Sequence, residues 1–151
     1  MSNTSEESRR YPSRPFLGIG ALIFDRDRSK LLLVQRGKEP LKGYWSLPGG
    51  IVEAGEKLEE GVRREVLEET GLEVEPVSMF EVFERITPDA DGKTEYHFVL
   101  IDYLCRVVGG NLAAASDVSQ VAWVAEKNLG DYRLTGGTLE VIERAFAKIQ
   151  R

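Results

Sequence analysis

The sequence contains few of the residues that most often carry metal or nucleophilic chemistry. Cysteine and histidine each occur once among 151 residues. A single cysteine excludes an internal disulfide and a cysteine-based zinc cluster, and Cys105 lies in an apolar run where we expect a small buried side chain. A lone His97 gives little support to a serine–histidine mechanism or to zinc held by several histidines. These absences direct attention to the carboxylates.

Long apolar segments and an excess of basic residues are also missing. No stretch approaches the roughly 18 apolar residues of a membrane span, so we expect no membrane association. Residues 1–13 are mostly polar, which indicates a disordered tail and not a signal peptide, and a cytoplasmic location is expected. The net charge of −5 argues against a nucleic-acid partner. A single domain over residues 14–151 fits this length.

Acidic residues are concentrated in one segment. Residues 50–72 contain seven Glu and three basic residues, a net charge of −4, so most of the charge imbalance is local. Glu65, Glu68 and Glu69 fall in the last turn of a helix expected over residues 57–70, which Gly71 ends. That end is the negative pole of the helix macrodipole and favours cations. Glutamates placed there indicate that a cation is bound nearby.

The apolar positions of this helix show which face its carboxylates occupy. At about 100° per residue, Leu58, Val62 and Val66 define an apolar stripe, and Glu65 and Glu69 lie within about 20° of its origin. A Glu-rich helix is more often a solvated face, but inward carboxylates destabilise the fold unless a cation neutralises them. Hard divalent cations prefer carboxylate oxygens. The segment therefore predicts a metal site.

The same segment resembles the signature of the Nudix (MutT-related) hydrolases. That signature is a Gly, five residues, a Glu, seven residues, and then Arg-Glu-apolar-x-Glu-Glu-x-Gly-apolar. Each fixed position is matched, by Gly50, Glu56, Arg64, Glu65, Val66, Glu68, Glu69, Gly71 and Leu72. The resemblance implies metal-dependent hydrolysis of a nucleoside diphosphate linked to another group. Mg²⁺ is the implied cofactor, with Mn²⁺ as an alternative.

The resemblance also implies which groups hold the metal. Glu65 and Glu69 are the first ligands, together with the backbone carbonyl of Gly49, and Glu68 serves a further ion. Mg²⁺ in proteins commonly takes one or two carboxylates and keeps positions for phosphates and water, which suits a short acidic cluster. An anionic substrate would otherwise be repelled by so acidic a segment.

Other signature positions have supporting roles by the same resemblance. Arg64 is expected to orient the carboxylates, and the alternative is an ordinary surface pair with a glutamate four residues away. Glu56 is expected to tie the preceding loop to the helix. Gly50 and Gly71 are expected to be conformational requirements without a chemical role.

Many Nudix enzymes use one more carboxylate, which acts as a base or metal ligand and comes from a loop outside the signature. In MutT-like enzymes it shortly precedes a strand that ends in Trp, and Asp117 occupies that place six residues before Trp123. The alternative for Asp117 is a solvated loop acid. Rival acids lie in and beside the polar loop that follows residue 87: Asp89, Asp91 and Glu95.

Residues outside the signature would select the substrate. Tyr44 and Trp45 are candidates for stacking on a nucleobase, with burial in the core as the alternative. Arg36 is a candidate phosphate ligand, with an ordinary surface cation as the alternative. These three residues are the substrate-binding candidates.

Further resemblances favour ADP-ribose or a similar nucleotide sugar as the substrate. Pro88 lies near a proline that marks ADP-ribose pyrophosphatases, and segments 43–50 and 97–107 are similar to bacterial members of that type. One alternative is a MutT-like nucleoside triphosphate pyrophosphohydrolase that removes oxidised nucleotides. Another is a ligand-sensing Nudix domain without catalysis. A small nucleotide is the expected partner in each case, and a homodimer is compatible with the ADP-ribose type.

The order of the expected elements predicts an α/β fold. Residues 16–24 and 30–35 are expected to form a hairpin, residues 48–50 a turn, and residues 137–150 a terminal helix. Strands are also expected at 44–47, 72–85, 95–108 and 120–125. This order predicts a mixed β-sheet with helices on both faces. The Nudix resemblance implies an α/β/α sandwich in which the signature forms a loop-helix-loop.

Overall fold

The computed structural model describes residues 9–150, which form two β-sheets and two longer α-helices. The elements in chain order are β1 (Phe16–Ile23), β2 (Lys30–Arg36), β3 (Trp45–Ser46), β4 (Gly49–Ile51), α2 (Leu58–Thr70), β5 (Leu72–Pro88), β6 (Thr94–Gly110), β7 (Val118–Ala125), the 3₁₀-helix η1 (Glu126–Asp131) and α3 (Thr138–Ile149). None of the helices within residues 9–150 has the length and apolar composition needed to cross a membrane.

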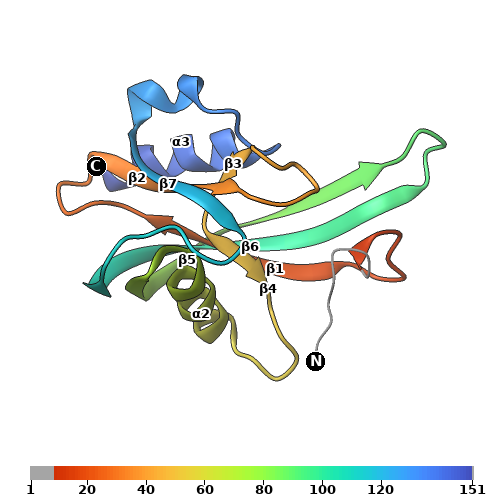
Figure 1. Ribbon diagram of the computed structural model, residues 1–151, viewed down its shortest axis with the longest axis horizontal. Helices are drawn as coiled ribbons and strands as arrows, with labels where there is room; N and C mark the ends of the chain where they lie inside the picture. Colours follow the sequence, from red (N-terminus) through yellow and green to blue (C-terminus); the bar gives the residue numbers. More distant parts are fainter. Residues whose placement is uncertain (1–8, 151) are drawn as a thin grey trace.

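The strands form one mixed and one antiparallel sheet. The first sheet has the order β4-β1-β6-β5, in which β1 runs parallel to β6 and antiparallel to β4. The second has the order β3-β2-β7 and is antiparallel throughout. Helices α2 and α3 lie on opposite sides of the sheets (Figure 1). This arrangement confirms the predicted mixed sheet flanked by helices.

The predicted hairpin between the first two strands is wrong. A single bridge joins Phe24 to Leu31, while β1 pairs along its whole length with β6 and β2 pairs with β7. The physical reason is burial, because Ile19 to Ile23 are buried on both faces of β1 and need neighbours on both edges. Strand β6 takes one edge of β1 and β4 takes the other at Gly18 to Gly20, so β2 pairs with β7 instead.

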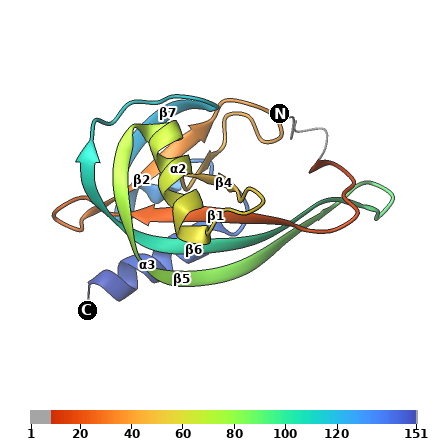
Figure 2. The same ribbon diagram turned by 90° about the horizontal axis from the view of Figure 1, so that it is seen from below.

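Two apolar cores hold the helices against the sheets. In the first, Val62 and Val66 of α2 pack against β1 and β6, with Leu32 of β2. In the second, α3 packs against Leu31 and Leu33 of the same strand. Strand β2 therefore serves both cores through the alternation of its side chains. Figure 2 shows α2 lying across the first sheet, away from α3.

The structure shows where Cys105 and the last residues of the predicted tail lie. Cys105 belongs to the first core and is 8% exposed, which confirms the expected small buried side chain. Residues 1–8 of the predicted tail lie outside the described part of the chain. Tyr11 contacts the β5–β6 connection, where its backbone N–H donates to the Glu95 carbonyl at 2.7 Å and its hydroxyl to Asp89 at 2.7 Å.

Candidate active site

Helix α2 carries the signature glutamates and has defined ends. At its start, the Glu60 carboxylate accepts a hydrogen bond from the Lys57 backbone N–H at 3.1 Å. At its end, Gly71 has φ 74° and donates its N–H to the Leu67 carbonyl at 3.0 Å. A left-handed residue after the last turn is readily adopted by glycine, which has no Cβ to clash. The predicted helix and its stop at Gly71 are confirmed.

The loop after β6 covers the C-terminal end of α2. Backbone N–H groups of Asn111, Ala113 and Ala115 donate to the carbonyls of Gly71, Thr70 and Glu69 at 3.2, 2.9 and 3.1 Å. These donors satisfy carbonyls at and just beyond the last helical turn, which lack partners within the helix. The same contacts bring the following residues of the loop, including Asp117, to the end of the helix that carries Glu68 and Glu69.

Strand β4 is the floor beneath the glutamates. Residues 48–50 were expected to form a turn, but Gly49 and Gly50 pair with Gly20 and Ile19 of β1. A Cβ at Gly49 would collide with the Ile19 carbonyl, and one at Gly50 would collide with the Glu65 carboxylate. The close approach of backbone and carboxylate is the reason why both positions need glycine.

Arg64 joins four groups around this floor. Its Nε and Nη2 atoms donate to Glu56 at 2.6 and 3.0 Å, and Nη2 also donates to the Ile51 carbonyl at 3.2 Å. Its Nη1 donates to Glu65 at 3.1 Å and to Glu68 at 3.3 Å. The guanidinium lowers the pKa of Glu56, chiefly through the hydrogen bond between them. Arg64 therefore links the loop before α2 to the carboxylates near its end.

The two carboxylates on the apolar side of α2 differ from their neighbour. The Glu65 side chain is 14% exposed and that of Glu68 is 51% exposed. Burial raises the pKa of Glu65 to about 7 and that of Glu69 to about 8, and the two carboxylates also repel each other. The hydrogen bond from the Gly49 N–H to Glu69, at 3.0 Å, opposes this shift. Glu65 is paired with Arg64 at 3.1 Å, and a further cation beside Glu69 would offset the desolvation of both carboxylates.

A cavity of about 470 Å³ brings most of the predicted site residues together. Its walls include Gly49, Gly50, Glu65, Glu68, Glu69, Asp117 and Arg36. Arg36 donates through Nε to the Pro40 carbonyl at 2.8 Å, and Lys38, which the sequence did not single out, forms an ion pair with Asp117 at 2.9 Å. The cavity therefore has an acidic wall on α2 and a basic wall after β2.

Comparison with known proteins identifies the family. A model of the NUDIX domain matches residues 14–145. The chain belongs to the Nudix family. Its signature helix is therefore the Nudix helix α2, and the cavity described above lies at the end of that helix.

Two curated proteins and one solved structure illustrate what the chain is similar to. An ADP-ribose pyrophosphatase from Methanocaldococcus jannaschii is 39% identical over 107 residues, which are 71% of this chain and 60% of that protein. The human 8-oxo-dGDP phosphatase NUDT18 is 32% identical over 82% of this chain and 36% of its own length. A crystal structure of a MutT Nudix hydrolase from Burkholderia pseudomallei, 31% identical, superposes with a TM-score of 0.76 over 87% of this chain and 98% of that one. The chain thus spans less than two thirds of each of these two curated relatives.

Other predicted residues lie apart from the Nudix cavity. The rival acids Asp89, Asp91 and Glu95 lie at the far turn of the β5–β6 hairpin, where Asp89 accepts backbone N–H bonds from Asp91 and Lys93 at 2.9 Å. That turn projects away from α2 in Figure 1. Of the proposed acids outside the signature, the structure brings Asp117 to the cavity.

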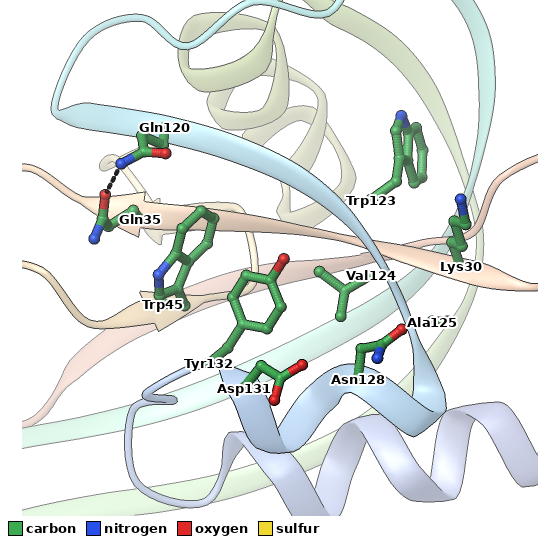
Figure 3. Close-up of a pocket in the computed structure, with 10 residues that line it drawn as sticks. All are labelled: Lys30, Gln35, Trp45, Gln120, Trp123, Val124, Ala125, Asn128, Asp131 and Tyr132. Atoms are coloured by element: carbon green, nitrogen blue, oxygen red, sulfur yellow. Dashed lines mark hydrogen bonds between the residues drawn. The ribbon is translucent and has the colours of Figure 1, made fainter.

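The side chains of Tyr44 and Trp45 also lie outside the Nudix cavity. Trp45 packs edge-to-face on Tyr132 at 5.0 Å between ring centroids, and both line a second cavity near η1 (Figure 3). The Tyr44 ring lies under the Arg133 guanidinium at 4.2 Å. The structure therefore does not bring Tyr44 and Trp45 together with the Nudix glutamates. Trp45 packs against the second core, as its alternative held, whereas the Tyr44 ring packs against Arg133.

A second charged pair in the Nudix cavity was not singled out from the sequence. Asp102 on β6 is 4% exposed, and its Oδ2 has no hydrogen-bond partner among residues 9–150. Arg85 on β5 donates through Nη2 to the Gly136 carbonyl at 2.7 Å, while its Nε also has no partner in that part of the chain. The signal for Asp102 was present, because it is a lone charge within the apolar run 98–105.

Burial raises the pKa of Asp102 to about 7, with a contribution from the nearby Glu81 charge. Because the folded pKa exceeds the ordinary 3.8, stability from this group is present below about pH 4 and is lost as the pH rises through 7. Asp102→Asn should therefore raise the free energy of unfolding at pH 8 by up to about 4 kcal/mol, since the pKa is raised from 3.8 to about 7 and each pKa unit is worth about 1.4 kcal/mol. This increase in the free energy of unfolding should be lost near pH 4.

Urea unfolding of both proteins at pH 4 and pH 8 would measure this effect. The control is Glu84→Gln on the exposed face of β5, which should change the free energy of unfolding by less than about 0.5 kcal/mol at either pH. Equal stability of wild type and Asp102→Asn at pH 8 would show that the buried carboxylate carries no penalty.

Proposed function

We propose that this Nudix protein hydrolyses the pyrophosphate linkage of a nucleoside diphosphate joined to another group. The observation that carries the proposal is the meeting of Glu65, Glu68 and Glu69 with Gly49 and two basic side chains in one cavity. Diphosphates need positive charge to offset their repulsion of a nucleophile, and a cavity with acidic and basic walls is suited to binding both a cation and phosphates.

The residues of the acidic wall fit a divalent cation such as Mg²⁺, with Mn²⁺ as an alternative. Glu65, Glu69 and the Gly49 carbonyl offer hard oxygen ligands, with Glu68 beside them, and the burial of the Glu65 and Glu69 carboxylates favours a cation that neutralises them. No group of three or more acidic, His or Cys side chains within residues 9–150 is already arranged around one point, because Arg64 pairs with Glu65 and Glu68. A bound ion would neutralise the phosphates and lower the pKa of the attacking water.

The basic wall supplies the remaining positive charge. Arg36 and Lys38 line the same cavity as the glutamates and are suited to hold phosphate oxygens. We propose Asp117 as the group that orients or deprotonates water, because its carboxylate lies in the same cavity and is 58% exposed. Its ion pair with Lys38 at 2.9 Å positions the carboxylate. Arg64 is a positioning residue, since it contacts the carboxylates and not the cavity opening.

ADP-ribose or a similar nucleotide sugar is the proposed substrate. The support is the 39% identity with an ADP-ribose pyrophosphatase over 71% of this chain. Oxidised nucleotides are the second candidate, because the human relative at 32% identity is an 8-oxo-dGDP phosphatase. A ligand-sensing domain without catalysis is the third, and the complete set of signature glutamates argues against it.

A screen of nucleotide derivatives with Mg²⁺ and with Mn²⁺ tests the proposal. ADP-ribose should yield AMP and ribose 5-phosphate, whereas a nucleoside triphosphatase would release a nucleoside monophosphate and pyrophosphate. Chromatography separates these products. Failure to hydrolyse any derivative with either metal would leave the sensing alternative in place of the enzyme.

Metal binding should also be visible without a substrate. Millimolar Mg²⁺ should raise the melting temperature, because it binds the assembled site and not the unfolded chain. Differential scanning fluorimetry at pH 7.5 would measure the shift, with Glu69→Gln as the variant that should lose it. An equal shift in both proteins would place the bound ion away from Glu69.

A further inference from the structure

One end of the Nudix cavity has no role in the chemistry proposed above. There, Asp102 and Arg85 each present a polar atom without a hydrogen-bond partner among residues 9–150, Oδ2 and Nε respectively. A buried carboxylate without a donor and a buried N–H without an acceptor are both costly. Their placement on the wall of a cavity indicates that a ligand supplies the missing partners.

The strand between this end and the Nudix glutamates contributes glycines to the cavity. Gly20 pairs with Gly49 on one side and with Asp102 on the other, and Gly18 pairs with Leu100 in the same way. A Cβ at Gly20 would collide with the Asp102 carboxylate, and one at Gly18 would lie 2.7 Å from the Leu100 side chain. The two glycines therefore let the Asp102 and Leu100 side chains lie directly over β1, where they form part of the cavity wall.

The distance across this strand suits a nucleoside monophosphate unit. Gly49 and Asp102 are separated by one strand, so their backbones lie roughly 10 Å apart at about 4.8 Å per strand. A phosphate held near Gly49 and Glu69 would therefore leave one ribose and one base to reach Asp102. The Phe83 ring, which also lines the cavity, offers an apolar surface for that base.

We propose that Asp102 and Arg85 form a base-recognition site that selects adenine. The Asp102 carboxylate accepts a hydrogen bond from the exocyclic amino group, and the Arg85 Nε–H donates to the neighbouring ring nitrogen. This inference rests on the proposed function, because the phosphates of the same nucleotide must occupy the end that carries the glutamates.

One free acceptor and one free donor on the wall of the same cavity are the feature that favours adenine. The adenine edge presents one amino donor beside a ring nitrogen acceptor, which matches the two unpartnered atoms one to one. Guanine presents two adjacent donors beside its carbonyl, and purine without the amino group presents no donor to the carboxylate. Cytosine presents the adenine pattern on a single ring, so CMP is the decisive competitor of AMP in the binding test. A site built to hydrogen-bond a ligand group rejects the analogue that lacks it, because its own polar atoms then stay unpaired.

Binding of nucleoside monophosphates tests the site without requiring hydrolysis. Isothermal titration calorimetry of the full chain at pH 8 with Mg²⁺ would compare AMP with purine riboside 5′-monophosphate, which lacks the amino group. The wild type should bind AMP at least about tenfold more tightly, as expected for a hydrogen bond to a charged acceptor. Asp102→Ala should bind the two within about threefold of each other.

A matched control and a second variant complete the design. Glu84→Gln removes a carboxylate from the exposed face next to Arg85 and should keep the wild-type ratio. Asp102→Asn keeps an uncharged acceptor, and its ratio of AMP affinity to purine riboside 5′-monophosphate affinity should lie between those of the wild type and Asp102→Ala. This variant tests the site if Asp102→Ala does not fold. Arg85→Lys keeps the charge, loses Nε and should weaken AMP binding.

Several results would overturn the adenine site. These are equal binding of AMP and purine riboside 5′-monophosphate by the wild type, an unchanged ratio of the two affinities in both Asp102 variants, tighter binding of GMP or CMP than of AMP, or no binding of either nucleotide at about 10 mM. The proposed hydrolysis is judged separately, by the product screen. A protein that prefers AMP but hydrolyses nothing would retain the base site and lose the enzymatic proposal.

Discussion

Replacing Glu69 with Gln should lower kcat/KM for the best nucleotide substrate by at least about a thousandfold. The change keeps the shape of the side chain but removes the charge of a proposed metal ligand, and metal-assisted charge neutralisation is worth several kcal/mol. The fold should survive, because the amide oxygen of Gln can still accept the Gly49 N–H bond at 3.0 Å. Steady-state kinetics at saturating Mg²⁺, with circular dichroism for the fold, would measure both effects.

A control on the same helix separates the site from general loss of charge. Glu59 lies on the exposed face of α2, and Glu59→Gln should leave kcat/KM within about twofold of the wild type. Glu65→Gln should also lower kcat/KM, by at least about a hundredfold, since its carboxylate shares the same buried wall. Wild-type kinetics in both Glu69→Gln and Glu65→Gln would exclude these carboxylates as metal ligands.

Replacing Arg64 with Met should destabilise the protein by about 3 kcal/mol at pH 7.5. The loss leaves the carboxylates of Glu56 and Glu65, 12% and 14% exposed, without their cation, and breaking a buried pair on one side is strongly destabilising. Urea unfolding would measure the change. Arg63→Met, on the exposed side of α2, is the matched control and should cost less than about 1 kcal/mol.

The pH dependence and a double variant test the cause of this destabilisation. Arg64 holds the pKa of Glu56 below the ordinary 4.5, so the stability from this pair is present above that pH and is lost as the pH falls through the lowered value. The difference in the free energy of unfolding between wild type and Arg64→Met should therefore become smaller at acidic pH. Glu56→Gln combined with Arg64→Met should be less destabilising than the sum of the two single changes. If the two losses of unfolding free energy simply add, Arg64 and Glu56 do not stabilise the fold as a direct pair.

The sequence predicts the helical part of the site well because that part depends on local chemistry. The spacing of Val62 and Val66 places Glu65 inward and leaves Glu68 to one side, and Gly71 ends the helix through its own backbone freedom. The strand order is different, since β1 pairs in parallel with β6, which lies far along the chain. Local patterns carry no record of that pairing, which is the reason why the hairpin expectation was wrong.

The parts of the cavity that come from long-range contacts were also beyond local patterns. Trp45 was a stacking candidate by its composition, but its neighbour Tyr132 is supplied by the segment after β7. Asp102 was visible as a charge in an apolar run, yet the position of its carboxylate over β1 arises because Gly20 of that strand, which has no Cβ, lies beside it. An unpaired buried atom is a property of the assembled fold and not of the run that contains it.

The three backbone hydrogen bonds from Asn111, Ala113 and Ala115 to the end of α2 have a consequence for chain length. They fix the number of residues between β6 and Asp117, because an insertion there would break the caps or carry Asp117 away from the cavity. The turn at residues 89–92, which is closed mainly by Asp89 bonding within the turn itself, has no such restriction. Natural insertions and deletions in related chains should therefore accumulate at that turn and be rare between Asn111 and Asp117.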